Sequence, residues 1–339
     1  MPNWIITAII AGLVAAAMQG TIMSLSAINA VIFYLSPLPL FLAGFSRGWL
    51  SAVLGTVVMA VLLTLVTGSL TFGLMSVISA GLAPIIASYL SMITRPVATP
   101  DVDQTTGVVA NTGASTSADT GEGEARTDDR EWYPEGRLIL WLAVIAAFVT
   151  GVSILAMGVD FETYKAFISG FIDPLVARFD KQMPPGQPPF PKEFFTRLMI
   201  SALPIAAAAI WLLATVTSMR IAIVVLTKTK LALRPWALFE QLAFPANSVI
   251  ALLASLVGAY FLSGIPQLLA LGAVGAFVSA FTILGLAIVH SLLGGNVARP
   301  MLLGLLYAGL LFFNWILAVP LTVLGLADLN FNFRKSKST

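Results

Sequence analysis

Long apolar stretches follow one another along most of the chain and give the first indication of its fold. A helix that rises 1.5 Å per residue needs roughly 20 apolar residues to cross the hydrocarbon core of a bilayer, which is about 30 Å thick. Stretches that approach or meet this length cover residues 4–23, 27–45, 49–67, 70–93, 138–158, 198–219, 246–262, 267–289 and 301–326. The pattern predicts an all-α fold, a polytopic transmembrane helical bundle of eight or nine spans.

The segment from Val159 to Arg197 has a different pattern. Apolar residues recur there at steps of three or four, with most charged residues between them; the apolar set is Phe161, Tyr164, Ile168, Phe171, Leu175 and Phe179. This periodicity indicates one amphipathic helix that lies in the membrane interface. Several prolines follow between residues 184 and 191 and favour a stiff, extended spacer. A ligand for a proline-binding domain is the alternative interpretation of that stretch.

The composition agrees with a membrane protein. Of the 339 residues, 58% are hydrophobic and only 10% are charged, and the mean hydropathy is +0.94. Because so few polar side chains cannot cover a water-soluble particle, a soluble enzyme is excluded. The chain has no cysteine and a single histidine, His290, which excludes disulfides, thiolate metal sites and multi-histidine metal centres.

Residues 94–136 form an acidic segment between two apolar parts. Nine acidic residues and three arginines give this segment a charge of −6, whereas fifteen basic and seven acidic residues give the rest of the chain +8. Small and polar residues dominate it, so it cannot bury enough apolar surface to offset the loss of chain entropy. We expect a disordered linker here, and an acidic binding segment is the alternative.

The chain therefore divides into four predicted parts. They are an N-terminal four-helix membrane unit (1–93), the acidic disordered cytoplasmic linker (94–136), a C-terminal membrane unit of about five spans that includes the interfacial and proline-rich segment 159–197 (137–327), and a basic tail (328–339).

Basic residues in short loops indicate the orientation, because they resist translocation. With nine spans, Arg47, the loop from Arg220 to Arg234, and Arg299 share one side, which places the N-terminus in the cytoplasm. The tail with Arg334 and Lys335 would then lie outside, against the same rule. An incomplete last crossing near Pro320, or one span fewer, would remove this conflict.

The predicted spans contain almost no ionisable residue. Ion-coupled transporters place such residues at membrane depth, so proton coupling is disfavoured. The polar residues of the spans are Gln19, Asn29, Asn247, Asn314, several hydroxyl residues and, near one end, His290. Phosphate-binding loops, His-Glu-x-x-His sequences and nucleophile–base sets do not occur, so we expect no enzyme activity, no catalytic or metal-binding residue and no cofactor. Single basic residues beside spans indicate membrane lipid as a partner and no nucleic acid.

Three segments carry a resemblance to a known family. They are SPLPLFLAGFSRG at Ser36–Gly48, after a first span with Gln19-Gly20, RPWALFEQLAFP at Arg234–Pro245, and LGLADLNFNFRK at Leu324–Lys335. They resemble segments of the YybS-like predicted membrane proteins, a bacterial family of unknown function. That family is distantly similar to the S components of energy-coupling-factor transporters, which capture a small molecule and depend on a separate ATPase-driven scaffold. The acidic linker, the proline-rich segment and the large C-terminal half depart from this pattern.

The resemblance implies a multi-pass protein of the bacterial cell (inner) membrane, a transport-related subunit that captures a small solute without its own ATPase. Prolines that break the second span would free backbone groups at membrane depth, where a solute can bind them. The candidate ligand-binding residues are Gln19, Asn29, Pro37, Pro39, Gly44 and Arg47. Arg47 could equally contact a lipid phosphate. The expected protein partner is a transporter scaffold with its ATPase.

The alternative is a non-transporting membrane scaffold or regulatory partner of envelope proteins. It would dock other membrane proteins through the tail, with Asp328 and Arg334 as the candidate contact residues, or through the interfacial helix.

Overall fold

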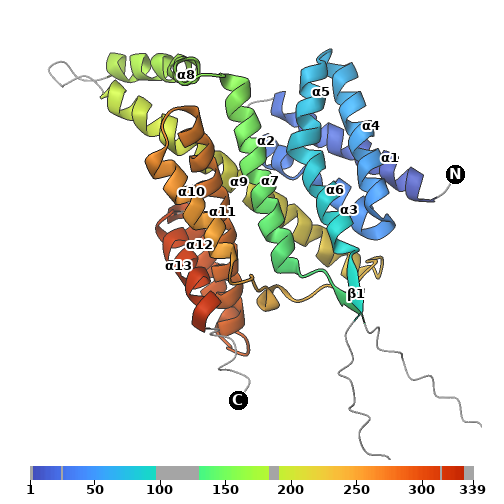
Figure 1. Cartoon of the computed structure of the whole chain (residues 1–339). Helices are drawn as coiled ribbons and strands as arrows, with labels where there is room; N and C mark the ends of the chain where they lie inside the picture. The colour runs from blue at the N-terminus through green and yellow to red at the C-terminus, as the bar shows by residue number, and fades with distance from the viewer. Residues whose placement is uncertain (1–2, 24–25, 97–129, 183–190, 314, 332–339) are drawn as a thin grey trace, which may run out of the picture.

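The computed structural model describes residues 3–23, 26–96, 130–182, 191–313 and 315–331. Nearly all of these residues are helical, and the strands among them are two short segments at one end of the molecule. Most helices run between that end and an opposite end, which is covered by α8 (Phe161–Gln182) (Figure 1). We call these the strand end and the α8 end. The predicted all-α bundle is confirmed.

The first part of the chain makes four passes through the bundle. Its helices are α1 (Asn3–Gly20), η1 (Thr21–Met23), α2 (Ala27–Tyr34), α3 (Pro37–Arg47), α4 (Trp49–Thr67), α5 (Leu70–Ser76), the π-helical η2 (Val77–Gly81) and α6 (Leu82–Ser91). Gly48 and Gly68 have positive φ angles of 95° and 66° and make the turns on either side of α4, because glycine adopts this conformation at little cost. The second and fourth passes are interrupted, at residues 35–36 and at η2.

The two ends of the acidic segment are ordered. Strand β1 (Thr94–Pro96) pairs antiparallel with β2 (Arg130–Trp132), and Arg95 lies opposite Glu131. Helix α7 (Glu135–Met157) starts soon after β2. The predicted boundaries of the disordered linker, 94–136, were therefore too wide at both ends, since backbone pairing and the first turn of α7 order them. Residues 97–129 lie outside the described residues.

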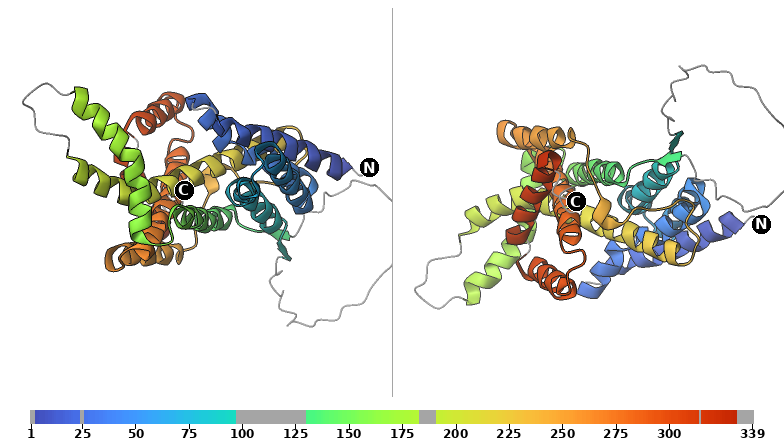
Figure 2. Two further views of the ribbon diagram at one scale, coloured as in Figure 1. Left: turned by 90° about the horizontal axis from the view of Figure 1, so that it is seen from above. Right: turned by 90° about the horizontal axis from the view of Figure 1, so that it is seen from below.

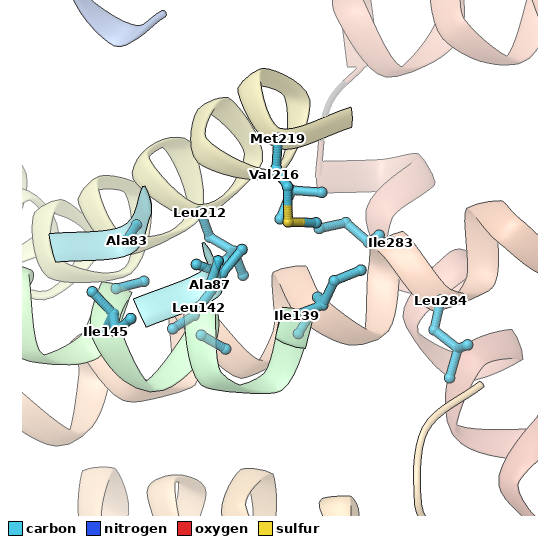
Figure 3. Close-up of a cluster of buried hydrophobic side chains, with 14 of the residues drawn as sticks. Ala83, Ala87, Ile139, Leu142, Ile145, Leu212, Val216, Met219, Ile283 and Leu284 are labelled. Carbon is cyan, nitrogen blue, oxygen red and sulfur yellow. The ribbon is translucent and has the colours of Figure 1, made fainter. Parts of the chain in front are cut away.

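The second part of the chain packs around α11. Its remaining elements are α9 (Lys192–Lys228), η3 (Phe239–Gln241), α10 (Ser248–Phe261), α11 (Ile265–Leu292), α12 (Arg299–Phe313) and α13 (Trp315–Phe331). Helix α11 contacts α7, α9, α10 and α13. Figure 3 shows side chains of α6, α7, α9 and α11 that meet in the largest apolar cluster, among them Ala83, Leu142, Leu212 and Ile283. The predicted N-terminal and C-terminal membrane units therefore share one core.

Helix α8 confirms the predicted amphipathic helix. Seen from above, it lies along its length across the bundle end, whereas α7 is seen end-on (Figure 2). One stripe is buried against the bundle, and it consists of Tyr164, Ile168, Ile172 and Val176. The adjacent stripe is exposed, and it consists of Phe167, Phe171, Leu175 and Phe179. The sequence pattern merged these two stripes into one, although only the first is buried against the bundle.

Large apolar side chains also cover the outside of the bundle. Leu65 of α4 is 75% exposed, Phe261 of α10 is 76% exposed and Phe312 of α12 is 78% exposed. Exposure of so wide an apolar surface to water is unfavourable, whereas contact with the hydrocarbon of a bilayer is not. Among the described residues, seven helices are long and apolar enough to cross a membrane. The chain is therefore a multi-pass, membrane-embedded protein.

Helix α10 adds one further pass although it has only 14 residues. Its first residue, Ser248, lies beside Arg137 and Trp141 of α7 at the strand end. Near its last turn, the Ala259 carbonyl accepts a hydrogen bond of 3.0 Å from Nε2 of Gln267, at the start of α11. The helix thus joins the two ends of the bundle, although it is shorter than the seven helices of membrane-spanning length.

The last apolar run turns back. Helices α12 and α13 are bent by 120° relative to each other. Helix α13 runs in the same direction as α11, because Thr322 Oγ1 lies 2.8 Å from Thr282 Oγ1 and Gly325 packs beside Gly285. Since α11 ends at the strand end, α13 ends there as well. This arrangement removes the conflict between the basic tail and the orientation rule.

We expect reporters fused after Gly113 and after Thr339 to report the same side of the membrane, and one fused after Gln187 to report the opposite side. The reason is that α13 returns to the strand end, where the basic loops also lie. Paired phosphatase and fluorescent-protein fusions in cells measure this. Opposite signals at Gly113 and Thr339 would show that the last run crosses the membrane.

Candidate functional site

A buried amide joins the two interrupted passes inside the first part of the bundle. The side chain of Gln19, near the end of α1, is only 3% exposed. Its Nε2 donates hydrogen bonds to Ser36 Oγ at 3.3 Å and to Ser79 Oγ at 3.4 Å. We call Gln19, Ser36, Ser79 and Trp211 the Gln19 cluster.

The break between α2 and α3 positions Ser36. Pro37 occupies the first turn of α3, where a missing N–H costs nothing. The turn before it satisfies its own backbone, because the Leu35 amide donates to the Val31 and Ile32 carbonyls and the Ser36 amide donates to the Phe33 carbonyl. The prolines therefore do not leave the freed amides that we expected at this break. Instead they direct the Ser36 hydroxyl towards Gln19.

The π-helical segment η2 positions Ser79. In this segment the Leu82 amide donates to the Val77 carbonyl, five residues back. The same register pairs the Ser79 carbonyl with Pro84, which has no N–H. The indole Nε1 of Trp211, halfway along α9, donates to that carbonyl at 2.8 Å. A π-helical turn inside a longer helix is frequently found at functional sites.

Two cavities adjoin the Gln19 cluster. The smaller, of about 20 Å³, lies between Gln19, Pro37 and Thr215 and is large enough for one water molecule. The larger, of about 310 Å³, lies between α1, α2, α5, η2, α7 and α8. Its wall is mainly apolar, with Gln19, Ser76, Ser79 and Ser153 as the polar residues and no charged one. A cavity of this size and character can enclose a small molecule.

The other candidate residues do not converge on this place. Pro39 is buried in α3 and Arg47 is exposed at its C-terminal end. Gly44 allows close packing of α3 against α6, since a Cβ there would collide with Ser88 Oγ. The Asn29 carbonyl accepts a hydrogen bond of 3.0 Å from Thr21 Oγ1, and Asn29 lines neither cavity. Gln19 and Pro37 are thus the predicted residues that the structure brings together.

The candidate tail contacts stay largely untested. Asp328 lies within α13 and is only 4% exposed, so its side chain is not offered to a partner. Arg334 lies outside the described residues. The sequence does not single out Ser36, Ser79 and Trp211, because serine and tryptophan residues are common in membrane spans. A proline directly after Ser36 and one five residues after Ser79 were the available signals.

A second group of polar side chains is buried at the strand end. Glu135, the first residue of α7, accepts hydrogen bonds from Arg220 Nη1 at 2.9 Å and from the Ala237 amide at 2.6 Å. Nη2 of Arg234 lies 3.8 Å from the same carboxylate. In the sequence, both arginines have the pattern of loop charges that indicate orientation. Here they join α9 and the loop after it to the start of α7.

Arg234 is the most enclosed member of this group, and its side chain is 3% exposed. Its Nη1 donates to the Ser91 carbonyl at 3.2 Å and to the Tyr133 carbonyl at 2.9 Å. The guanidinium carbon lies 3.9 Å from the centre of the Trp236 ring. Burial lowers the pKa of Arg234 to about 10, against the opposing effect of Glu135. It is still charged at neutral pH and joins three segments of the chain at the strand end.

No family model, no curated protein and no solved structure significantly matches this chain. The resemblance to YybS-like proteins therefore stays a prediction, and the argument for function rests on the chain's own residues.

Replacing Glu135 with alanine should destabilise the protein by about 3–5 kcal/mol, because Arg220 and Arg234 are then left without their counter-charge. Thermal unfolding of the purified protein in detergent measures this. Glu131→Ala is the matched control: that carboxylate is exposed in β2, so its loss should stay within about 0.5 kcal/mol. Equal losses in both variants would contradict this role of Glu135.

Proposed function

We propose that this multi-pass membrane protein captures a small neutral solute in the 310 Å³ cavity beside the Gln19 cluster, as a transport-related subunit without its own ATPase. The observation that carries the proposal is the amide of Gln19. It is buried where two interrupted passes meet, donates to a serine from each of them and lines the cavity. Membrane transporters hold their substrates at such interruptions, since helix breaks concentrate polar groups there.

The polar atoms of the cavity define the class of solute. Nε2 of Gln19 is already used on two hydroxyls. The Ser76 hydroxyl donates to the Gly73 carbonyl at 2.6 Å, and the Ser153 hydroxyl donates to the Val149 carbonyl at 2.9 Å. Gln19, Ser76 and Ser153 therefore offer acceptors, whereas Ser79, whose oxygen accepts from Gln19, keeps a hydroxyl proton to donate. Together they suit a molecule with an apolar body and one or two polar groups, without a charge.

Helix α8 borders the entrance of this cavity. Phe167, from its exposed stripe, lines the cavity together with Met157 at the end of α7. A solute that partitions into the interface at the α8 end would reach the cavity past these two side chains. We infer an entry route from the membrane interface, which agrees with an apolar, uncharged solute.

Gln19→Leu should abolish capture. A buried hydrogen bond lost from a solute costs about 1–3 kcal/mol, so affinity should fall about ten-fold or more. The measurement is the rise in unfolding temperature of the detergent-purified protein with a panel of neutral vitamins and metabolites, beside a lipid panel. Gln267→Leu is the matched control, because it also removes an amide hydrogen bond in the bundle but lies outside the cavity.

The proposal fails if lipids alone raise the unfolding temperature, or if Gln19→Leu and Gln267→Leu respond to a bound compound alike. Ser153→Leu gives an independent check, since it fills the cavity without removing a bond of Gln19. This substitution should weaken the binding of the same compound and leave the unfolding temperature of the ligand-free protein close to that of the parent protein.

The transport-related part of the proposal has its own test. Affinity purification from mild detergent should retain an ATPase and its membrane scaffold, because the chain itself carries no phosphate-binding loop. Envelope or regulatory proteins in their place would favour the non-transporting scaffold instead. A variant with Gln19→Leu should retain the same partners, since the cavity is internal.

A further inference from the structure

A groove at the strand end has chemistry that the Gln19 cavity lacks. It lies between α7 and α10, has a volume of about 320 Å³ and shares no lining residue with that cavity. One part of it is polar, with Arg137, Asn247 and Ser248. The other part is apolar, with Leu140, Val144 and Phe277. The groove is therefore amphipathic along its length.

The polar part offers unused donors. Arg137 is exposed and forms no ion pair with a described residue. The Ser248 hydroxyl is buried and has no hydrogen-bond partner among the described residues, and the residue is 7% exposed. Asn247 precedes α10 without capping it through its side chain. The Ser248 and Ile250 amides already donate to the Pro245 and Asn247 carbonyls, so the helix start contributes its dipole. A helix dipole, a free hydroxyl and a guanidinium in one place suit a phosphate group.

We propose that this groove binds one anionic phospholipid, with its phosphate between Arg137 and the start of α10 and an acyl chain along Leu140, Val144 and Phe277. Trp141 lies beside the polar part, and its Nε1 donates to the Tyr133 hydroxyl at 3.1 Å. Tryptophan and tyrosine concentrate at the level of lipid headgroups, so this pair marks the depth at which a phosphate would lie.

The charges in the groove favour an anionic lipid over a zwitterionic one. Arg137 supplies one positive charge, and no acidic residue lines the groove. The nearest carboxylate in sequence, Glu135, is held by Arg220 and the Ala237 amide. The ammonium of a zwitterionic headgroup would therefore find no partner, whereas a phosphodiester with a neutral headgroup matches the single charge.

The size and surroundings of the groove favour a lipid over a free anion. Its volume greatly exceeds that of a phosphate ion, and its apolar part continues into the outer surface of the bundle, where Trp141 is 47% exposed and Val144 is 44% exposed. An acyl chain in this position would remain continuous with the surrounding hydrocarbon. A soluble phosphate would use the polar part alone.

The test compares phosphatidylglycerol, phosphatidylcholine and inorganic phosphate on the delipidated, full-length protein in detergent, with native mass spectrometry and the unfolding temperature as readouts. Phosphatidylglycerol should bind the parent protein most tightly. Arg137→Gln should lower the affinity for phosphatidylglycerol about five-fold, the value expected for the loss of one basic residue at an anionic headgroup. Arg95→Gln is the matched control, since Arg95 is exposed in β1 at the same end and should leave binding unchanged.

Ala251→Trp tests the contribution of the groove's shape to lipid binding separately from that of its charge, because it fills the groove without removing a basic residue. It should abolish phosphatidylglycerol binding, and if it fails to fold, the pair Arg137→Gln and Arg95→Gln still decides. Equal binding of phosphatidylcholine, equal weakening by both arginine variants, or unchanged binding in Arg137→Gln would each overturn the proposal. Displacement of phosphatidylglycerol by millimolar inorganic phosphate would assign the groove to a free anion instead.

Discussion

Hydrocarbon offers no hydrogen bonds, and this constraint governs where the chain places every break and every charge. Backbone groups freed by a break must find partners within the protein. The turn at residues 35–36 bonds its own carbonyls, and the Ser79 carbonyl receives the indole of Trp211. Charges are excluded for the same reason, so Glu135 and its arginines meet at the strand end rather than in the middle of a pass.

The interruptions of the second and fourth passes together bring two serine hydroxyls to Gln19. Within a continuous helical turn a side-chain hydroxyl can bond the helix's own backbone, as Ser153 does with the Val149 carbonyl. The turn before Pro37 and the π-helical turn η2 instead present Ser36 and Ser79 to a different helix, where they meet Gln19. The polarity of the cavity therefore depends on local irregularity in two passes. The rest of each pass supplies its apolar wall.

Sequence alone could predict the apolar passes and α8, because length and periodicity decide them. It could also single out Gln19, since an amide inside a span needs a partner. It could not find Ser79, because the π-helical register depends on packing against α9, nor the partners of Arg234, which come from segments far apart in the chain. The turn between α12 and α13 was equally hidden, since an apolar run of sufficient length is compatible with crossing or with returning.

Helix α7 has no polar face in its sequence, because each of its sides meets an apolar environment. Residues 137, 140, 141 and 144 recur at helical spacing and face the proposed lipid groove, whereas residues 149, 152, 153 and 156 face the Gln19 cavity. The two sets are separated by about 120° around the helix axis at 100° per residue. Leu142 and Ala146 lie on nearly the same side as the cavity set, about one to three turns before it along the helix, in the core. A helix that meets lipid on one side and the core and a cavity on the other must be apolar all round. The few polar residues of α7 distinguish its two sites: Arg137, near its start, lies in the proposed lipid groove, and Ser153, further along, lines the Gln19 cavity.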